Sequence, residues 1–226
     1  MITSLKAMNK RMKKIANYIK MSLFFMTLGA IVLYLAGVPL VSYTVSLGNM
    51  IMVKGAPGYP DEYNPELLKL VNDNISALDE SEIQVPTLET QYGTIRCDTV
   101  ALTAPLYYGD SESSLLNGVG QYPLSGFPGN GKPILVSGHD ATFFAPLEKI
   151  EIGNVINITT NYGEYEYKVV ATKIASSADT TAYDLTQDKE QLILYTCYPF
   201  GQLIGNRSDR FFVYCDRIRG IRDAAK

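Results

Sequence analysis

Histidine and cysteine are scarce in this chain, and tryptophan is absent. The sequence holds one histidine, His139, and three cysteines, Cys97, Cys197 and Cys215, against 16 tyrosines. An odd number of cysteines leaves at least one thiol free unless it pairs with another chain. No internal repeat or low-complexity segment is present, and the tyrosine content favours a β-rich fold.

Acidic residues are missing from residues 1–20, which carry six basic side chains. All 23 acidic residues lie further on, so the rest of the protein is acidic, although the formal net charge of the whole chain is only −3. An acidic body argues against nucleic acid as a partner, because phosphate backbones are bound by basic surfaces.

Charged residues are also absent from residues 21–43. At ~1.5 Å per residue, a helix of this length crosses a hydrocarbon core of ~30 Å. The preceding basic residues favour the cytoplasmic side, which places the C-terminal body outside the cell. A cleaved signal peptide is the alternative, but the apolar stretch is longer than a usual signal core and lacks a clear small-residue cleavage site. We therefore predict a cytoplasmic tail over 1–20 and a single-pass type II transmembrane anchor over 21–43.

The segment after the anchor, residues 44–91, is predicted to be a linker that contains a short amphipathic helix. Asn64 suits the N-cap, Pro65 suits the first helical position, and apolar residues recur at helical spacing as far as Leu78. From residue 92 onward the pattern changes to short alternating strands separated by turns. Six or more such strands with few helices predict an all-β domain over 92–226, either a closed barrel or a sandwich.

Two chemically reactive side chains each follow an apolar strand. His139 comes after the strand 134–137 and Gly138, which permits a sharp turn. Loop starts at strand ends often carry catalytic side chains, although a lone histidine can also serve only a local hydrogen bond. Cys197 ends the strand in "LILYTCYPF". Its alternative role is that of a small, buried core residue.

A third residue, Arg210, opens the last strand and strengthens the catalytic interpretation. Strand alternation directs it away from the apolar face of "FFVYC". If this strand pairs antiparallel with the Cys197 strand, the two residues can lie side by side. A thiolate is a strong nucleophile that a nearby cation favours, an imidazole can protonate a leaving amine, and a guanidinium can stabilise an oxyanion. Arg207 is the rival for this role, and its loop-like neighbours indicate a solvated side chain.

Four segments in order along the chain resemble motifs of the sortases, the cysteine transpeptidases that attach proteins to bacterial cell walls. They are "LNGVGQYPLSGFPGNGKPILVSGH", "SGHDATFFAPLEKIEIGNVINI", "YTCYPF" and "IGNRSDRFFVYC". Tyr195 and Asn154 stand where many members have other residues. The last segment places the family's catalytic arginine at Arg210. The resemblance covers roughly residues 92–217, and "TCYPF" most resembles the class D branch.

The resemblance implies a closed eight-stranded β-barrel with short helices and a substrate groove that leads to Cys197. It implies that Cys197 attacks the Thr–Gly bond of an LPxTG-like C-terminal sorting signal on a secreted protein. The thioacyl enzyme would pass the acyl group to an amine of a peptidoglycan precursor or to a protein lysine. His139 would act as general acid and base, and Arg210 would bind carbonyl oxygens. We expect further substrate contacts from Thr196, Tyr198 and Ser137.

No cofactor and no metal are expected. The loop 175–190 is interpreted either as a specificity loop over the groove or as a solvated connection. The spacing of its acidic residues matches no known calcium cage. These are Asp179, Asp184, Asp188 and Glu190. We also expect Cys97 and Cys215 to be free buried thiols.

Three alternatives stay open. One is a pilin-polymerising sortase, although residues 44–91 lack the Asp-Pro-aromatic tripeptide found in the lids of pilus-building relatives. Another is a thiol hydrolase on the same scaffold, which would pass the acyl group to water. The third is a non-catalytic, membrane-tethered binding domain with Cys197 in its core.

Overall fold

The computed structural model describes residues 2–52, 85–202 and 207–220. It divides into two compact units, Met1–Thr44 and Val45–Lys226. The expected amphipathic helix from Pro65 to Leu78 lies outside the described residues and stays a prediction.

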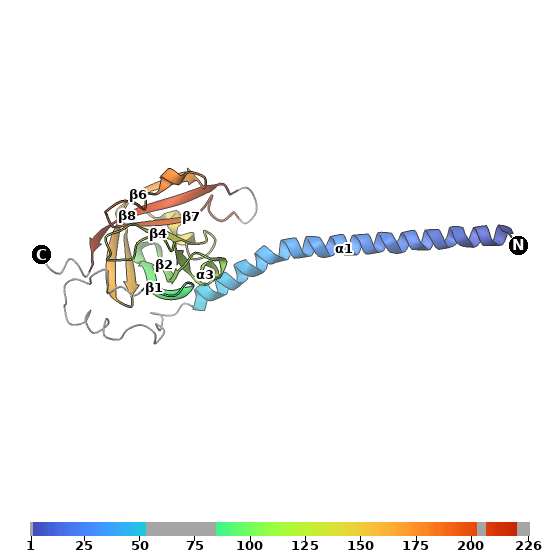
Figure 1. The fold of residues 1–226 in the computed structure, drawn as a ribbon, viewed down its shortest axis with the longest axis horizontal. Helices are drawn as coiled ribbons and strands as arrows, with labels where there is room; N and C mark the ends of the chain where they lie inside the picture. Colours follow the sequence, from blue (N-terminus) through green and yellow to red (C-terminus); the bar gives the residue numbers. More distant parts are fainter. Residues whose placement is uncertain (1, 53–84, 203–206, 221–226) are drawn as a thin grey trace. The chain divides into compact units, whose positions relative to one another are not determined.

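One long helix, α1, spans Ile2–Met52 (Figure 1), and its residues from Val45 onward are assigned to the second unit. Its segment Lys14–Leu35 is long and apolar enough to cross a membrane. The helix is longer than the predicted anchor, because it also includes the basic residues before it and the first part of the expected linker. In the second unit, Asn49 Nδ2 donates to the Leu116 carbonyl at 3.1 Å and to Asn117 Oδ1 at 3.0 Å, which holds the last turns.

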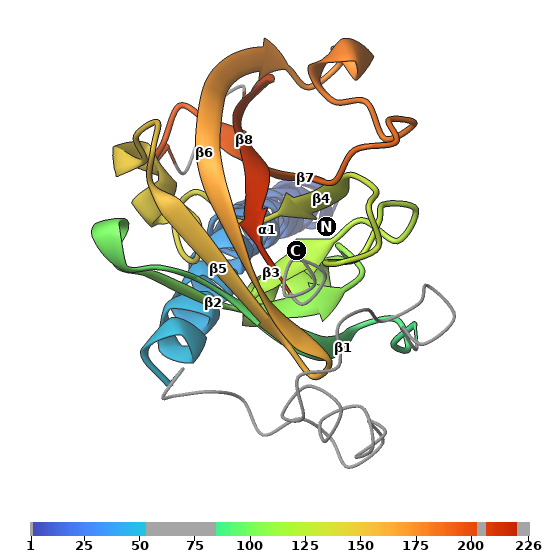
Figure 2. The same cartoon turned by 90° about the vertical axis from the view of Figure 1, so that its left-hand side faces the viewer.

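The second unit is a closed β-barrel, as the family resemblance implied (Figure 2). Around the barrel the strands follow the order β1-β2-β3-β4-β7-β8-β6-β5. Their bounds are β1 Thr90–Cys97, β2 Leu102–Tyr108, β3 Val119–Gln121, β4 Ile134–Ser137, β5 Val155–Thr160, β6 Gly163–Ser176, β7 Gln191–Tyr198 and β8 Asp209–Arg219. The short helices are α3 Glu112–Asn117, η2 Asp98–Val100, η3 Ala145–Lys149 and η4 Thr180–Ala182.

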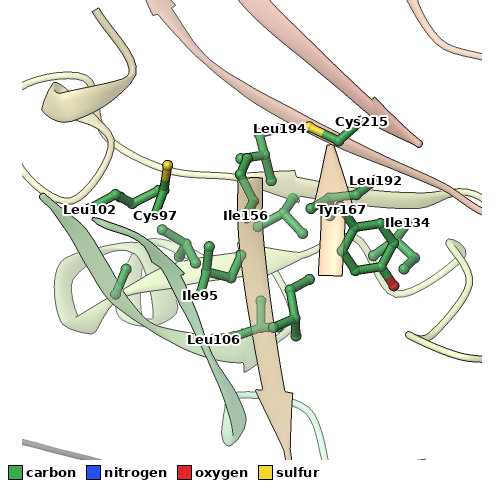
Figure 3. Packing of buried hydrophobic residues seen from close by; sticks show 14 of the residues in the cluster. Ile95, Cys97, Leu102, Leu106, Ile134, Ile156, Tyr167, Leu192, Leu194 and Cys215 are labelled. Carbon is green, nitrogen blue, oxygen red and sulfur yellow. The ribbon is translucent and has the colours of Figure 1, made fainter. Parts of the chain in front are cut away.

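Strand alternation builds the barrel interior. Leu192 and Leu194 of β7 point inward and are fully buried, as is Ile156 of β5 (Figure 3). Val213 of β8 is fully buried in the same cluster. Burial of apolar side chains like these contributes roughly 1.5–3 kcal/mol each relative to exposure. The barrel is therefore closed around a continuous apolar core that fixes the strand registers from within.

Two of the three cysteines belong to that core. Cys97 and Cys215 are completely buried and free, which confirms the expectation of two unpaired interior thiols (Figure 3). Burial raises the pKa of the Cys215 thiol, and the neighbouring Cys97 and Asp216 add to the effect. Because both thiols are completely buried, reagents in solution do not reach them in the folded barrel.

Candidate active site

The pairing of β4 with β7 brings His139 to the level of Cys197. The two strands are parallel, with Ser137 opposite Tyr195, and the Gly138 amide donates to the Tyr195 carbonyl at 3.3 Å. His139 lies two residues after Ser137, and Cys197 lies two residues after Tyr195. Parallel neighbours end at the same edge of a sheet, so the imidazole and the thiol lie at one rim of the barrel.

The backbone around His139 is fixed by its own loop. The His139 carbonyl accepts from the Phe144 amide at 3.0 Å and from the Thr142 amide at 3.3 Å. A side chain at Gly138 would collide with the Phe144 ring, since a Cβ there would lie only 2.6 Å from it. The glycine therefore lets Phe144 pack under the turn, while the His139 side chain itself is partly exposed.

Cys197 and Arg210 are direct cross-strand neighbours. Strands β7 and β8 are antiparallel, and their register pairs these two residues, as the sequence predicted. Both side chains are partly exposed, in contrast to the two interior cysteines. Side chains directly opposite each other on one face have Cβ atoms roughly 4.5–5.5 Å apart, so the guanidinium can reach groups bound at the thiol.

The Arg210 guanidinium is oriented by two backbone carbonyls. Its Nη1 donates to the Arg207 carbonyl at 2.8 Å and to the Asp209 carbonyl at 2.9 Å. The guanidinium has five N–H donors, so these two bonds leave others to meet a substrate oxygen.

Arg207, which we had interpreted as solvated, is instead paired. It forms an ion pair with Asp140, and its side chain is only 23% exposed. The physical reason is that Asp140 is buried, at 2% exposure, and an ionised carboxylate in that position requires a cationic partner. The two arginines therefore have different partners: Arg207 is ion-paired with Asp140, whereas Arg210 lies opposite Cys197.

Asp140 itself was missed by the sequence interpretation. Besides its ion pair, it accepts a hydrogen bond from the Gly201 amide at 3.0 Å. The available signal was an acidic residue directly after the only histidine. The sequence did not reveal that this carboxylate is buried, nor that its partners lie more than 60 residues further along the chain.

The three expected substrate-contact residues divide between two faces. Ser137 lies on the same face of β4 as Leu135 but is only 7% exposed, and its hydroxyl donates to the Gly120 carbonyl at 3.4 Å. Tyr198 is partly exposed beside the Phe200 ring, at a centroid distance of 6.2 Å. Thr196 is only 2% exposed, and its hydroxyl donates to the Gly138 carbonyl at 2.7 Å. Thr196 therefore faces the interior with Leu192 and Leu194 and holds the turn before His139, and its expected contact with substrate stays a prediction.

An apolar strip extends from Cys197 along the outer face of the barrel. Tyr195 of β7 stacks on Phe212 of β8, with ring centroids 5.6 Å apart, and Phe212 stacks on Tyr214. Burial raises the pKa of Tyr195, so its hydroxyl stays protonated over the physiological range. The strip is completed by Leu135, Ala175, Ala182 and Ile193.

The loop between β6 and β7 is tied to this strip and organised by its own carboxylates. Tyr214 donates its hydroxyl to the Ala182 carbonyl. Asp179 and Asp184 accept hydrogen bonds from the hydroxyls, and also from the amides, of Thr181 and Thr186, which lowers the pKa of both carboxyls. Among the described residues, no three histidine, cysteine or acidic side chains are grouped so that they could hold a metal ion.

Comparisons with known proteins give one consistent family. The sortase domain model matches residues 95–218. Sortase D of Bacillus subtilis is 35% identical over 126 residues, which cover 56% of this chain and 63% of that protein, so less than two thirds of the relative's length is matched. Sortase A of Listeria monocytogenes is 23% identical over 152 residues, 61% of this chain and 68% of that protein.

Solved structures share the fold. A Clostridium perfringens sortase D5 transpeptidase aligns with a TM-score of 0.55 at 20% identity, over 70% of this chain and 91% of that one. A Clostridium perfringens sortase C with the C-terminal cell wall sorting motif aligns with a TM-score of 0.55 at 23% identity, over 72% and 92%. The match to the domain model covers more than half of the chain, and the chain therefore belongs to the sortase family, with a class D-like sequence.

Proposed function

We propose that this protein is a membrane-anchored cysteine transpeptidase that cleaves an LPxTG-like sorting signal between Thr and Gly. The acyl group would pass to an amine, in the first place that of a cell-wall precursor. The observation that carries the proposal is the strand register, in which Cys197 faces Arg210 while His139 follows the end of the parallel neighbour β4 by two residues.

In the acylation step, the Cys197 thiolate attacks the threonine carbonyl carbon and forms a C–S bond. The carbonyl oxygen becomes an oxyanion, which the Arg210 guanidinium stabilises with N–H donors other than Nη1. The C–N bond then breaks, and His139 as imidazolium protonates the departing glycine amine. The products are a thioester on Cys197 and a neutral imidazole.

In the second step, an amine attacks the thioester carbonyl. The neutral His139 imidazole accepts the proton of the attacking amine, and the new C–N bond forms while the C–S bond breaks. The thiolate and the imidazolium are thereby regenerated. Water in place of the amine would give hydrolysis through the same two steps.

The apolar strip along β7 and β8 supports a peptide substrate with apolar residues before the cleaved bond. On the face of β7 that carries Cys197, Tyr195 is partly exposed and packs over Phe212 and Ile193, which are themselves buried. The Clostridium perfringens sortase C noted above was solved with a C-terminal cell wall sorting motif, which makes such a motif the first candidate ligand here.

The apolar segment Lys14–Leu35 supports a membrane anchor. Positive charge near the N-terminus favours a cytoplasmic N-terminus, which would give a type II orientation with the barrel outside the cell. This arrangement would hold the enzyme where secreted substrates and wall precursors meet.

The proposal is tested by incubating the full-length protein in detergent with a fluorogenic LPxTG peptide, with and without a glycine-based amine. We expect cleavage between Thr and Gly and a ligated product when the amine is present. Cleavage with no ligation at any amine concentration would favour the hydrolase. No cleavage of any LPxTG-like peptide, with Cys197 unreactive to alkylation, would favour the non-catalytic binding domain.

A further inference from the structure

The carboxylate of Asp140 joins both ends of the connection between β7 and β8 to the loop of His139. One oxygen, Oδ2, accepts from the amide of Gly201, just after the Cys197 strand, and the other, Oδ1, is ion-paired with Arg207, just before the Arg210 strand. Asp140 is 2% exposed, so both contacts are made away from bulk solvent. Charge-assisted contacts of this kind are roughly twice as strong as neutral ones.

The contact continues from Arg207 to Arg210 through the backbone. The Arg207 carbonyl accepts from Arg210 Nη1 at 2.8 Å, so the position of the Arg207 main chain sets the direction of the Arg210 side chain. The second acceptor, the Asp209 carbonyl, is part of the same short segment. A shift of this segment would therefore move both acceptors of the guanidinium together.

We propose that Asp140 is a positioning residue that acts through Arg207 to aim the Arg210 guanidinium at the substrate carbonyl. This inference rests on the proposed function, because it assigns Asp140 a role in the same acyl transfer. A misplacement of about 1 Å can cost on the order of 10²-fold in rate. Loss of the Asp140–Arg207 pair therefore slows the chemical step although neither residue touches the reacting atoms.

Asp140→Asn is the most direct perturbation, because the amide keeps the size of the side chain and an oxygen for the Gly201 amide but removes the charge facing Arg207. We expect kcat to fall by about 10- to 100-fold with KM changed less than about threefold. Asp98→Asn is the matched control, since Asp98 also pairs with an arginine, Arg96, but is 70% exposed. The control is expected to retain full activity.

The decisive measurement repeats Asp140→Asn in an Arg210→Ala background, read by product formation over long incubations. If Asp140 acts through Arg210, the second substitution adds less than about a twofold loss there. An equal loss in both backgrounds would overturn the proposal and leave Asp140 a general structural role. Full activity of Asp140→Asn in the native background would overturn it as well.

Arg207→Gln provides a second approach if Asp140→Asn does not fold. It should reproduce the fall in kcat, and the double variant of Asp140 and Arg207 should be no slower than either single variant. Independent, multiplying losses would contradict the proposal. Cys197 should be alkylated at the native rate in each folded variant. This measurement distinguishes a misdirected Arg210 side chain from a disrupted active site. If the proposed function itself were wrong, the result would differ from both outcomes above, because the native protein would then transfer no acyl group.

Discussion

Glu190 offers a sharp test of how the barrel holds its loops. This residue is buried just before β7 and accepts four hydrogen bonds from three segments of the chain. Oε1 accepts from the Gly129 amide at 3.0 Å and the Tyr167 hydroxyl at 2.7 Å, and Oε2 accepts from the Gly131 amide at 3.0 Å and Arg217 Nη1 at 3.1 Å. A glutamine in this position can reproduce the first pair but must present its NH₂ group to the second pair of donors.

The cost of Glu190→Gln follows from these contacts. Each buried donor left without an acceptor costs about 1–3 kcal/mol. The Arg217 side chain is 19% exposed and can be hydrated in part, so we expect a total loss of about 2–4 kcal/mol in the free energy of unfolding. For a domain of this size, that loss lowers Tm by roughly 5–15 °C.

Thermal unfolding followed by tyrosine fluorescence can measure this change, because the protein has 16 tyrosines and no tryptophan. Asp188→Asn is the matched control, since Asp188 lies in the same loop and pairs with Lys132 but is 90% exposed. The control should unfold at close to the native temperature, because an exposed ion pair contributes little to stability. If the two variants unfolded at the same temperature, the assignment of Glu190 as a buried anchor would be refuted.

Three other perturbations test the site and the core. Arg210→Ala should slow acyl transfer by on the order of 10²-fold or more. Arg207→Ala should fold and transfer the acyl group faster than Arg210→Ala does. If peptide assays gave the reverse order, the catalytic role would have been assigned to the wrong arginine. Thr196→Val should lower the free energy of unfolding by about 1–2 kcal/mol and also reduce activity, because it leaves the Gly138 carbonyl unpaired; unchanged denaturant midpoints would contradict this. Above the ordinary thiol pKa of about 8.5, the unfolded chain releases the Cys215 proton while the folded barrel retains it, so the free energy of unfolding should fall as pH rises. In alkaline denaturation curves, Cys215→Ala should show a weaker fall in the free energy of unfolding than the native protein.

Sequence patterns alone predicted the parts of the site that depend on strand periodicity. Cys197 and Arg210 lie in consecutive strands, and alternation directed Arg210 away from the apolar residues of β8, so their pairing needed only the antiparallel register that was found. His139 follows the short apolar strand β4. Its position beside Cys197 depends on the parallel pairing of β4 with β7, two strands that are far apart in the sequence. The family resemblance, not periodicity, supplied that adjacency and the choice of a barrel over a sandwich.

The same periodicity contained a signal that was not used. Leu192 and Leu194 are core residues of β7, and Thr196 is the next residue on their face, so its burial and its bond to Gly138 follow from alternation. The expectation that Thr196 contacts substrate rested on its nearness in sequence to Cys197. Neighbours in a strand point to opposite faces.

Long-range polar contacts could not be read from sequence patterns. Nothing in the residues around Arg207 indicates that a buried Asp140 pairs with it, because such a contact depends on how two loops meet in space. The four bonds of Glu190 likewise join segments that share no sequence pattern. Side chains of this kind are identified only when burial and partner are known together.

The formation of a thioester on Cys197 tests the central claim most directly. The full-length protein is incubated with an LPxTG peptide in the absence of an amine, quenched in acid and digested, and the masses of the cysteine-containing fragments are measured. The account predicts that the fragment with Cys197 gains the acyl part of the peptide up to its threonine, that hydroxylamine removes it, and that Cys197→Ala abolishes both adduct and product. Peptide cleavage that persists in Cys197→Ala, or an adduct on another residue, would contradict it.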